Sequence, residues 1–286
     1  MRMLAIAALL APAPALAAWP DDLVVSGMLE HSGGTVTPEY AREQLTAVAT
    51  DLGVAIANKP ITPARTLGTA GFDLSAGVTV SLLTKPVETE DGTPTGWLLA
   101  SQGEDPNALM VLPTMTLRKG LPASIEVGAR ASWLAGSRQG VLSGYVRAAP
   151  IEGFKPLPDV SFQVGYSGYV GNPELELGVM DVTGSLGGTF AFGSFPGIRQ
   201  AQWSPWIGGG ILVMHGRTTL DDIDRTALWA DTADEDGLVV ESLELGLQPQ
   251  VHAGFQVTNS TVLFRIAGAW SPSSIPTLHA GMGFMF

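Results

Sequence analysis

Residues 70–82 read AGFDLSAGVTVSL, and apolar side chains alternate with small or polar ones along the stretch. From Phe72 to Leu82 every second residue is apolar, and residues such as Asp73 and Ser75 stand between them. Successive side chains of a strand point to opposite faces, so this strand has one apolar and one polar face. The apolar face requires a partner: a second sheet in a sandwich, the inside of a lipocalin, or lipid around a membrane barrel.

The same alternation recurs along most of the chain. The Gly-rich segment 206–215 does not show which face is apolar, and near Met180 the alternation changes phase, which predicts a β-bulge. Together the segments predict about ten strands, in a range of about 8 to 12, and an even number is the rule in single-chain bacterial outer-membrane barrels. The segments after the first lie at residues 111–117, 125–133, 142–148, 160–166, 175–192, 206–215, 243–257, 262–270 and 278–286.

Hydropathy favours lipid as the partner of these faces. Beyond the first residues, no apolar run reaches the roughly 18 residues of a spanning helix, so spanning requires a closed barrel. The chain is 45% hydrophobic and 15% charged, which is too apolar for a disordered protein. We therefore expect an all-β fold, a transmembrane antiparallel β-barrel with a short N-terminal amphipathic helix. The alternative, a soluble sandwich or lipocalin, leaves many apolar faces to bury.

Connector lengths indicate an orientation, because outer-membrane barrels have short periplasmic turns and longer external loops. If the first strand runs outward, residues 119–122 and 258–260 are short periplasmic turns, and the longest connectors, 83–108 and 216–237, are external. Aromatic residues then form two girdles, as expected at membrane interfaces. The outer girdle holds Trp133, Tyr166, Tyr169 and Trp270, and the inner one Phe72, Phe190, Phe192, Trp206, Phe255, Phe284 and Phe286.

Both ends of the sequence are typical of an exported protein of the bacterial outer membrane. Residues 1–17 place Arg2 before an apolar core and end in Ala-Leu-Ala, the pattern of a cleavable signal peptide. The final residue, Phe286, resembles the C-terminal assembly signal of outer-membrane barrels, which implies the barrel assembly machinery as a partner. The formal charge of −12 becomes −13 when Arg2 leaves, so nucleic acid is not an expected partner. The absence of cysteine excludes a lipid-anchored N-terminus, a disulfide and a Cys-based metal site.

Between the signal peptide and the barrel, residues 18–65 form an N-terminal periplasmic or plug segment. Thr37, Pro38 and Glu39 have the pattern of a helix start, and helical spacing of apolar residues predicts a helix over 38–58. This helix either packs at the periplasmic rim or enters the barrel and plugs it. Residues 66–286 are then the outer-membrane barrel.

The segment NKPITPARTLGTAGFDLSAG at residues 58–77 resembles that of a group of uncharacterised proteobacterial outer-membrane barrels. In this group a Lys-Pro-x-x-Pro-Ala run leads through Leu-Gly and Gly-Phe-Asp into the first strand, and residues 118–122 resemble its first periplasmic turn. The resemblance implies the fold and carries no assigned activity. The matching residues are Lys59, Pro60, Pro63, Ala64, Leu67, Gly68, Gly71, Phe72 and Asp73.

Charged and histidine side chains on the polar faces of the strands are candidates for the barrel lumen. In a narrow lumen, side chains of both signs either pair into a salt-bridged plug or line opposite walls and bias the passage of solutes. The sequence leaves both arrangements open. The lumen candidates are Asp73, Glu126, Arg130, Arg147, Glu244, His252, Arg265 and His279.

The external connector after residue 216 carries an acidic loop with Arg225 as its single cation. A solvated loop is the ordinary interpretation, and divalent cations that bridge it to anionic lipopolysaccharide are the alternative. Its match to a calcium loop is weak because Leu243 stands in place of the closing Glu, and no metal site is predicted. The acidic residues are Asp221, Asp222, Asp224, Asp231, Asp234, Glu235 and Asp236.

Three functions follow from this interpretation, and none requires a cofactor. The leading hypothesis is a narrow channel or transporter for small or amphiphilic solutes. The alternative is a closed structural or surface-interaction barrel with acidic external loops, in contact with outer-membrane lipid and lipopolysaccharide. The third is an enzyme, since ten-stranded omptin proteases pair His with Asp near the outer rim and His215 precedes Asp221. Outer-membrane lipid hydrolases use Ser with His, but no histidine has an evident same-face Ser partner. We expect the protein not to be an enzyme.

Overall fold

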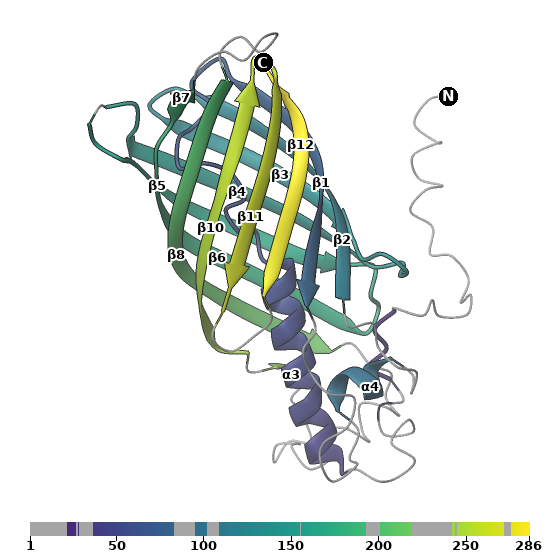
Figure 1. The fold of residues 1–286 in the computed structure, drawn as a ribbon. Coiled ribbons are helices and arrows are strands. Elements are labelled where there is room, and N and C mark those ends of the chain that lie inside the picture. Colours follow the sequence, from purple (N-terminus) through teal and green to yellow (C-terminus); the bar gives the residue numbers. More distant parts are fainter. Residues whose placement is uncertain are drawn as a thin grey trace, which may run out of the picture.

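A closed antiparallel β-barrel of ten long strands forms the body of the protein (Figure 1), as the alternation predicts. The computed structural model describes residues 22–26, 28, 37–82, 95–101, 109–154, 156–192, 201–218, 242–243, 245–271 and 276–286. The long strands are β1 (Phe72–Leu82), β2 (Leu109–Leu121), β3 (Ile125–Trp133), β4 (Gly140–Ile151), β5 (Asp159–Val170), β6 (Leu175–Gly187), β8 (Ala201–Thr218), β10 (Leu247–Asn259), β11 (Val262–Trp270) and β12 (Thr277–Met285). The short elements are strands β7 (Phe190–Phe192) and β9 (Ser242–Leu243) and helices α3 (Pro38–Ile56) and α4 (Gly96–Ala100).

The ring closes between the first and last strands. β1 pairs with β12 from Asp73↔Met285 to Ser81↔Thr277. At the end of this pairing, Phe72 and Phe286 exchange backbone hydrogen bonds of 2.9 and 2.8 Å. Elsewhere each long strand pairs with its neighbour, including β6 with β8 and β8 with β10. Full closure leaves no edge strand in the wall of the barrel.

The outer face of the barrel is a belt of exposed apolar side chains. Each of the ten long strands contributes at least one, because the alternating residues of a strand point to one face. Their relative exposure ranges from 43% to 63% in the following set, which takes one residue from each strand. The set is Leu74, Met115, Trp133, Leu142, Phe162, Leu186, Ile207, Val251, Phe264 and Leu278.

The predicted bulge near Met180 is absent. β6 keeps an unbroken register with β5 and with β8 across this position. The phase of the apolar residues changes because the inner face of β6 changes partner along the strand. Leu177 and Val179 point inward and pack in the cluster that contains α3, whereas Val182 lies on the exposed outer face. The structure places a register irregularity between β4 and β5, at Ala148 to Ile151.

Two girdle assignments were wrong, since Tyr169 and Trp206 both point inward. Tyr169 is 8% exposed and donates its hydroxyl hydrogen to the side-chain carbonyl of Gln139. Trp206 is 3% exposed and donates to a backbone carbonyl inside the barrel. The amphipathic rings of Tyr and Trp suit a membrane interface, but they equally satisfy buried acceptors. Trp133, Tyr166 and Trp270 are exposed on the outer face.

The first short turn lies later in the chain than its predicted place at 119–122. β2 continues to Leu121, and the turn occupies 122–124, where Ala123 and Ser124 adopt positive φ values of 61° and 55°. Arg118 consequently lies inside the strand and points into the barrel, where it is 2% exposed.

Helix α3 starts as predicted and ends at Ile56, before the buried segment that leads to β1. The side chain of Thr37 caps it by accepting a hydrogen bond from the backbone N–H of Tyr40 at 3.3 Å. The helix enters the barrel mouth opposite Phe286, beside α4 (Figure 1). No described helix is long and apolar enough to cross a membrane.

The interior around α3 is apolar, in contrast to the rest of the lumen. The buried face of the helix packs with α4 and with inward-pointing residues at the adjacent ends of several strands. This cluster also holds Leu243 and Leu245. Both were expected on the apolar outer face of one long strand, but Gly246, with a φ of 65°, separates them from β10. Representative members are Leu45, Leu52, Trp97, Leu112, Val179, Leu212 and Met214.

Candidate functional site

The segment between α3 and β1 lies in the lumen. Residues 57–66, which we call the linker, are buried except for Arg65. Side chains of the barrel wall bind its backbone carbonyl oxygens, and its two prolines have no backbone N–H that would require a partner. The donors are Gln163 Nε2 to Asn58 (3.0 Å), Arg130 Nη2 to Lys59 (3.2 Å), Trp206 Nε1 to Pro60 (3.4 Å) and Arg147 Nη1 to Pro63 (2.8 Å).

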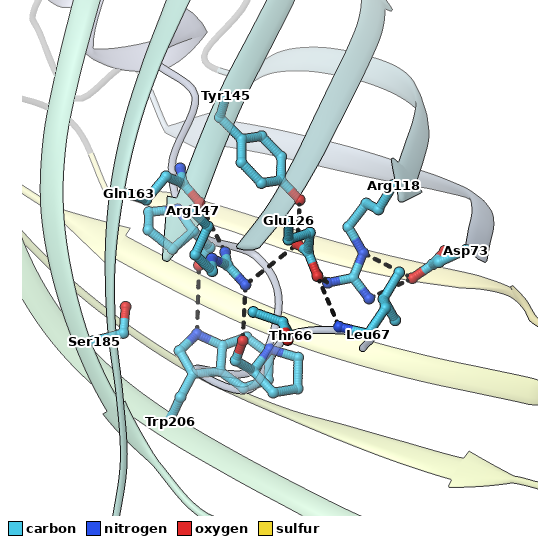
Figure 2. A network of polar contacts seen from close by, with 12 residues as sticks. Thr66, Leu67, Asp73, Arg118, Glu126, Tyr145, Arg147, Gln163, Ser185 and Trp206 are labelled. Atoms are coloured by element: carbon cyan, nitrogen blue, oxygen red, sulfur yellow. Dashed lines mark hydrogen bonds and ion pairs between the residues drawn. The ribbon is translucent and has the colours of Figure 1, made fainter. Parts of the chain in front are cut away.

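Next to the linker, buried charges of both signs form a connected network (Figure 2). Asp73 of β1 accepts hydrogen bonds from Arg118 at 2.7 and 3.0 Å and from Arg265 at 2.5 Å. Arg118 also pairs with Glu126 at 3.3 Å, and Arg147 lies 3.7 Å from the same carboxylate. These five side chains are at most 2% exposed. The network joins β1, β2, β3, β4 and β11 across the barrel interior.

Glu126 connects the network to the chain that enters β1. Its carboxylate accepts from the hydroxyl of Tyr145 at 2.9 Å and from the backbone N–H of Leu67 at 3.2 Å (Figure 2). Just before Leu67, the backbone N–H of Thr66 donates to Glu152 at 2.8 Å. Buried ion pairs are retained only where further hydrogen bonds satisfy both partners, and removal of one partner leaves an uncompensated charge. The wall charges therefore hold the linker as well as one another.

A serine–histidine pair lies in the wall beside this network, contrary to the expectation that no histidine has a same-face Ser partner. Ser185 of β6 and Nε2 of His252 of β10 are 2.9 Å apart, although β8 lies between these strands. Gly208 of β8 makes this contact possible: a Cβ there would lie 2.5 Å from His252 Nε2. The other ring nitrogen of His252 has no hydrogen-bond partner, so no acid orients the ring.

The remaining described histidines have hydroxyl partners. His279 Nδ1 lies 3.0 Å from the hydroxyl of Thr79 inside the barrel. His215 is exposed on the outer face of β8, where it stacks on Tyr166 with ring centroids 5.9 Å apart. Within the described ranges, no group of three His, Cys, Asp or Glu residues has the arrangement of a metal site.

Most of the predicted lumen residues lie on the inner face of the wall. Asp73, Glu126, Arg147 and Arg265 belong to the network; Arg130 holds the linker, and His252 and His279 bind hydroxyl groups. Several predictions fall outside the described residues, namely the signal peptide, Glu244 and the acidic residues Asp221, Asp222, Asp224, Asp231, Asp234, Glu235 and Asp236.

Several contributors to the site were not among the predicted residues, including Arg118, Gln163, Asp181 and Lys59. Arg118 and Gln163 follow the inward phase of their strands, so their faces were predictable. Asp181 was concealed by the change of phase in β6, yet it is fully buried and accepts from Gln163 at 3.3 Å. Lys59 belongs to the linker, which has no periodicity from which its position follows.

No family model and no curated protein matches the chain. Solved barrels of the bacterial outer membrane are similar at low identity. Ail, the attachment invasion locus protein of Yersinia pestis, is 11% identical over 76% of this chain and 99% of that chain, with a TM-score of 0.27. The N-terminal β-barrel domain of Pseudomonas aeruginosa OprF is 11% identical over 77% of this chain and 99% of that chain, with a TM-score of 0.28. Acinetobacter baumannii Omp33 is 8% identical over 77% of this chain and 99% of that chain, with a TM-score of 0.26. The barrel assignment rests on the strand pairing.

Proposed function

We propose that this chain is an integral outer-membrane barrel that its own N-terminal segment closes, and that it acts as a structural or surface-interaction barrel. Membrane placement is supported by the apolar belt, because a soluble monomer rarely exposes a contiguous apolar surface of this kind. The signal-peptide pattern of residues 1–17 supports export. The observation that carries closure is the buried linker, whose carbonyls are bound from several sides of the wall.

The filled lumen is why a closed barrel is preferred to an open channel. A conducting barrel needs a continuous path of water. Instead, the linker and the network fill the middle of the lumen, and a cavity beside Lys59 measures about 30 Å³. A water molecule needs roughly 10–15 Å³ measured in this way, so this cavity holds about two.

One end of the barrel carries a folded cap that suits surface interactions. Trp97 of α4 donates to Asp51 of α3 at 3.1 Å, and the backbone of Val24 bonds to that of Ala100 at 3.0 Å. The cap lies opposite Phe286, at the end from which the two longest connectors leave. Connector lengths support the external side for this end, so the proposal departs from the expectation that the helix packs at the periplasmic rim. Lipopolysaccharide and divalent cations at the acidic loop are proposed partners there, and the assembly machinery is the proposed partner of the last strand.

A gated channel or transporter is the second candidate. The linker is held in the lumen through hydrogen bonds, although residues 67–71 join it to β1, so its departure from the lumen would leave Arg130 and Arg147 lining a charged passage. An enzyme is the third candidate. Its best support is the Ser185–His252 pair, which lacks an acid on the second ring nitrogen.

Planar-bilayer recording tests closure. The purified chain should show no single-channel steps, and a chain without residues 18–65 should show them if it retains the barrel. Steps from the intact chain would contradict the closed barrel and favour the channel. Neutralising Arg130 or Glu126 would then be expected to change ion selectivity.

A further inference from the structure

The wall of the barrel has a notch at the rim that carries Phe286. β5 begins at Asp159, and its pairing with β6 ends there, at Asp159↔Gly187. β7 follows β6 and continues along β8 to Phe192↔Ala201, so it extends past the start of β5 (Figure 1). In the part of the chain that the structure describes, no strand pairs with the other edge of β7. The wall is therefore open at this rim between β5 and β7.

A groove passes through the notch and reaches both faces of the wall. Its volume is about 1020 Å³, slightly above the range of roughly 300–1,000 Å³ that is usual for small-molecule sites. Trp206 lines it from the inner face, whereas Leu186 and Ile207 line it from the outer face, where they are 50% and 63% exposed. Exposed Phe154 and Leu157 of the β4–β5 connection form the opposite side. The groove suits a ligand with a large apolar part.

The groove carries one cation and one carboxylate that do not pair with each other. Arg65 is the exposed residue of the linker, and no carboxylate of the described residues lies within ion-pair distance of it. Asp159 accepts a hydrogen bond from the backbone N–H of Gly153 at 2.7 Å through Oδ1, and its Oδ2 has no donor among the described residues. Both charges lie next to Gly153, since Nη2 of Arg65 would be 3.5 Å from a Cβ there. The groove therefore offers a site for a phosphate and a site for an ammonium group close together.

The apolar surface continues from the groove along the outer face of the barrel. Leu186 pairs with Ile207, and the next outward-facing pair of the same two strands is Gly184↔Gly209. Two glycines side by side leave a shallow trough in the wall beyond the groove. An acyl chain that leaves the groove through the notch can follow this trough into the apolar belt.

We propose that the notch binds one phospholipid with a zwitterionic phosphoethanolamine head. The phosphate accepts hydrogen bonds from Arg65, the ammonium group donates to Oδ2 of Asp159, and the acyl chains pass over Leu186 and Ile207. An anionic glycerol head has no cation for Asp159, and a choline head has no N–H to donate. The proposal rests on the placement of the barrel in lipid that we proposed above, and in the proposed orientation the ligand comes from the periplasmic leaflet.

Native mass spectrometry of the full chain released from detergent micelles tests the head-group contacts. Dioleoyl phosphatidylethanolamine, phosphatidylcholine and phosphatidylglycerol are each titrated into the protein, and the parent should bind one phosphatidylethanolamine more tightly than the other two lipids. Arg65→Gln should weaken binding of all three about two- to fivefold, the range for a partly exposed ion pair, because all three share the phosphate. Arg217→Gln, at a cation of the outer surface, is the control and should bind as the parent does.

Asp159→Asn tests the contact with the ammonium group. Asn retains an acceptor for the backbone N–H of Gly153 and lacks the charge. The variant should bind phosphatidylethanolamine only as well as phosphatidylcholine, and its binding of phosphatidylcholine and phosphatidylglycerol should not weaken. Heat-modifiable migration in gels establishes that each variant has folded.

Filling the groove tests its location. Ala191 lines the groove and is exposed, and Ala131 is equally exposed on the outer face of β3. Ala191→Trp should reduce binding of phosphatidylethanolamine, whereas Ala131→Trp should not.

Two results would overturn the proposal. One is equal binding of the three lipids by the parent, which would mean that the lipid only surrounds the barrel. The other is unchanged binding of phosphatidylethanolamine by folded Arg65→Gln and folded Ala191→Trp. Failure of the proposed function has separate signatures: conductance of the intact chain would contradict closure, and a fluorescence of Trp203 that brominated lipids do not quench would contradict the placement in lipid.

Discussion

The guanidinium group of Arg147 donates a hydrogen bond of 2.8 Å to the carbonyl oxygen of Pro63. The same group donates to Gln163 at 2.8 Å and lies 3.7 Å from Glu126. One side chain of β4 thus connects the linker with the charged network and with β5. Since Arg has five N–H donors in a fixed planar arrangement, a single Arg can hold three acceptors on different elements.

Replacement of Arg147 by Met should strongly destabilise the barrel. The change leaves Glu126 with one ion-pair partner fewer and removes the donors to Pro63 and Gln163, so we expect a loss of about 3–5 kcal/mol in the free energy of unfolding. Urea-induced unfolding in micelles measures it. Arg217→Gln breaks an exposed pair with Glu176 and should change stability by no more than about 1 kcal/mol. Equal effects of the two changes would contradict the role of Arg147.

Trp206 and Trp203 should respond differently to lipid, because they lie on opposite faces of β8. Trp206 is 3% exposed inside the barrel, whereas Trp203 is 44% exposed outside. Phospholipids with brominated acyl chains quench tryptophans that contact them. Trp203→Phe should therefore reduce the quenched fraction of the fluorescence, and Trp206→Phe should reduce only the unquenched fraction. The reverse pattern would place Trp206 in the girdle that the sequence suggested.

Gly208 should tolerate no side chain. A Cβ there would lie 2.1 Å from the carbonyl oxygen of Gly184 and 2.5 Å from His252 Nε2. Gly208→Ala should lower stability by about 1–3 kcal/mol, the usual range for overpacking. At Gly144 the nearest atom to a new Cβ lies 3.6 Å away, so Gly144→Ala is the matched control. If the unfolding curves of the two variants coincided, the wall would be shown to adjust freely around His252.

The cap should be accessible from outside the cell. The chain has no cysteine, so single cysteines can be placed at exposed Glu43 of α3 and at exposed Ala123 in the turn at the opposite end. On intact cells, a membrane-impermeant maleimide should label Glu43→Cys and leave Ala123→Cys unlabelled until the outer membrane is permeabilised. Labelling of Ala123→Cys alone would mean that the cap faces the periplasm.

The ten strands could be predicted because alternation is a local property, and each strand faces a uniform partner over most of its length. Prediction from alternation failed where the surface that packs on a strand changes along its length. Leu177 and Val179 of β6 point inward because α3 covers them, and no local pattern contains that information. A helix at residues 38–58 was expected, and it extends from Pro38 to Ile56. Its place at the mouth opposite Phe286 depends on contacts far apart in the sequence.

The inner charges were predictable in part for the same reason. Glu126 and Arg147 follow the inward phase of clear strands, whereas Arg118 was assigned to a turn because the end of β2 could not be located from Gly120 and Pro122 alone. Residues 18–65 were expected as a periplasmic or plug segment, but the path of the linker inside the lumen was not predicted. An extended segment with two prolines has no periodicity, and its position depends on donors from four different strands.

The measurement that tests the closed lumen most directly is disulfide formation between Ala64→Cys and Gly187→Cys. A Cβ at Gly187 on the inner face of β6 would lie 3.2 Å from the Cβ of Ala64, within a few tenths of an ångström of the roughly 3.5–4.5 Å found in disulfides. Gly184 lies on the outer face of the same strand, where a Cβ would meet Phe162. With the barrel in outer-membrane vesicles, oxidation should consume both thiols of the Ala64→Cys/Gly187→Cys chain, and those of Ala64→Cys/Gly184→Cys should stay free. Free thiols in the first chain, with a folded barrel, would mean that the linker does not occupy the lumen.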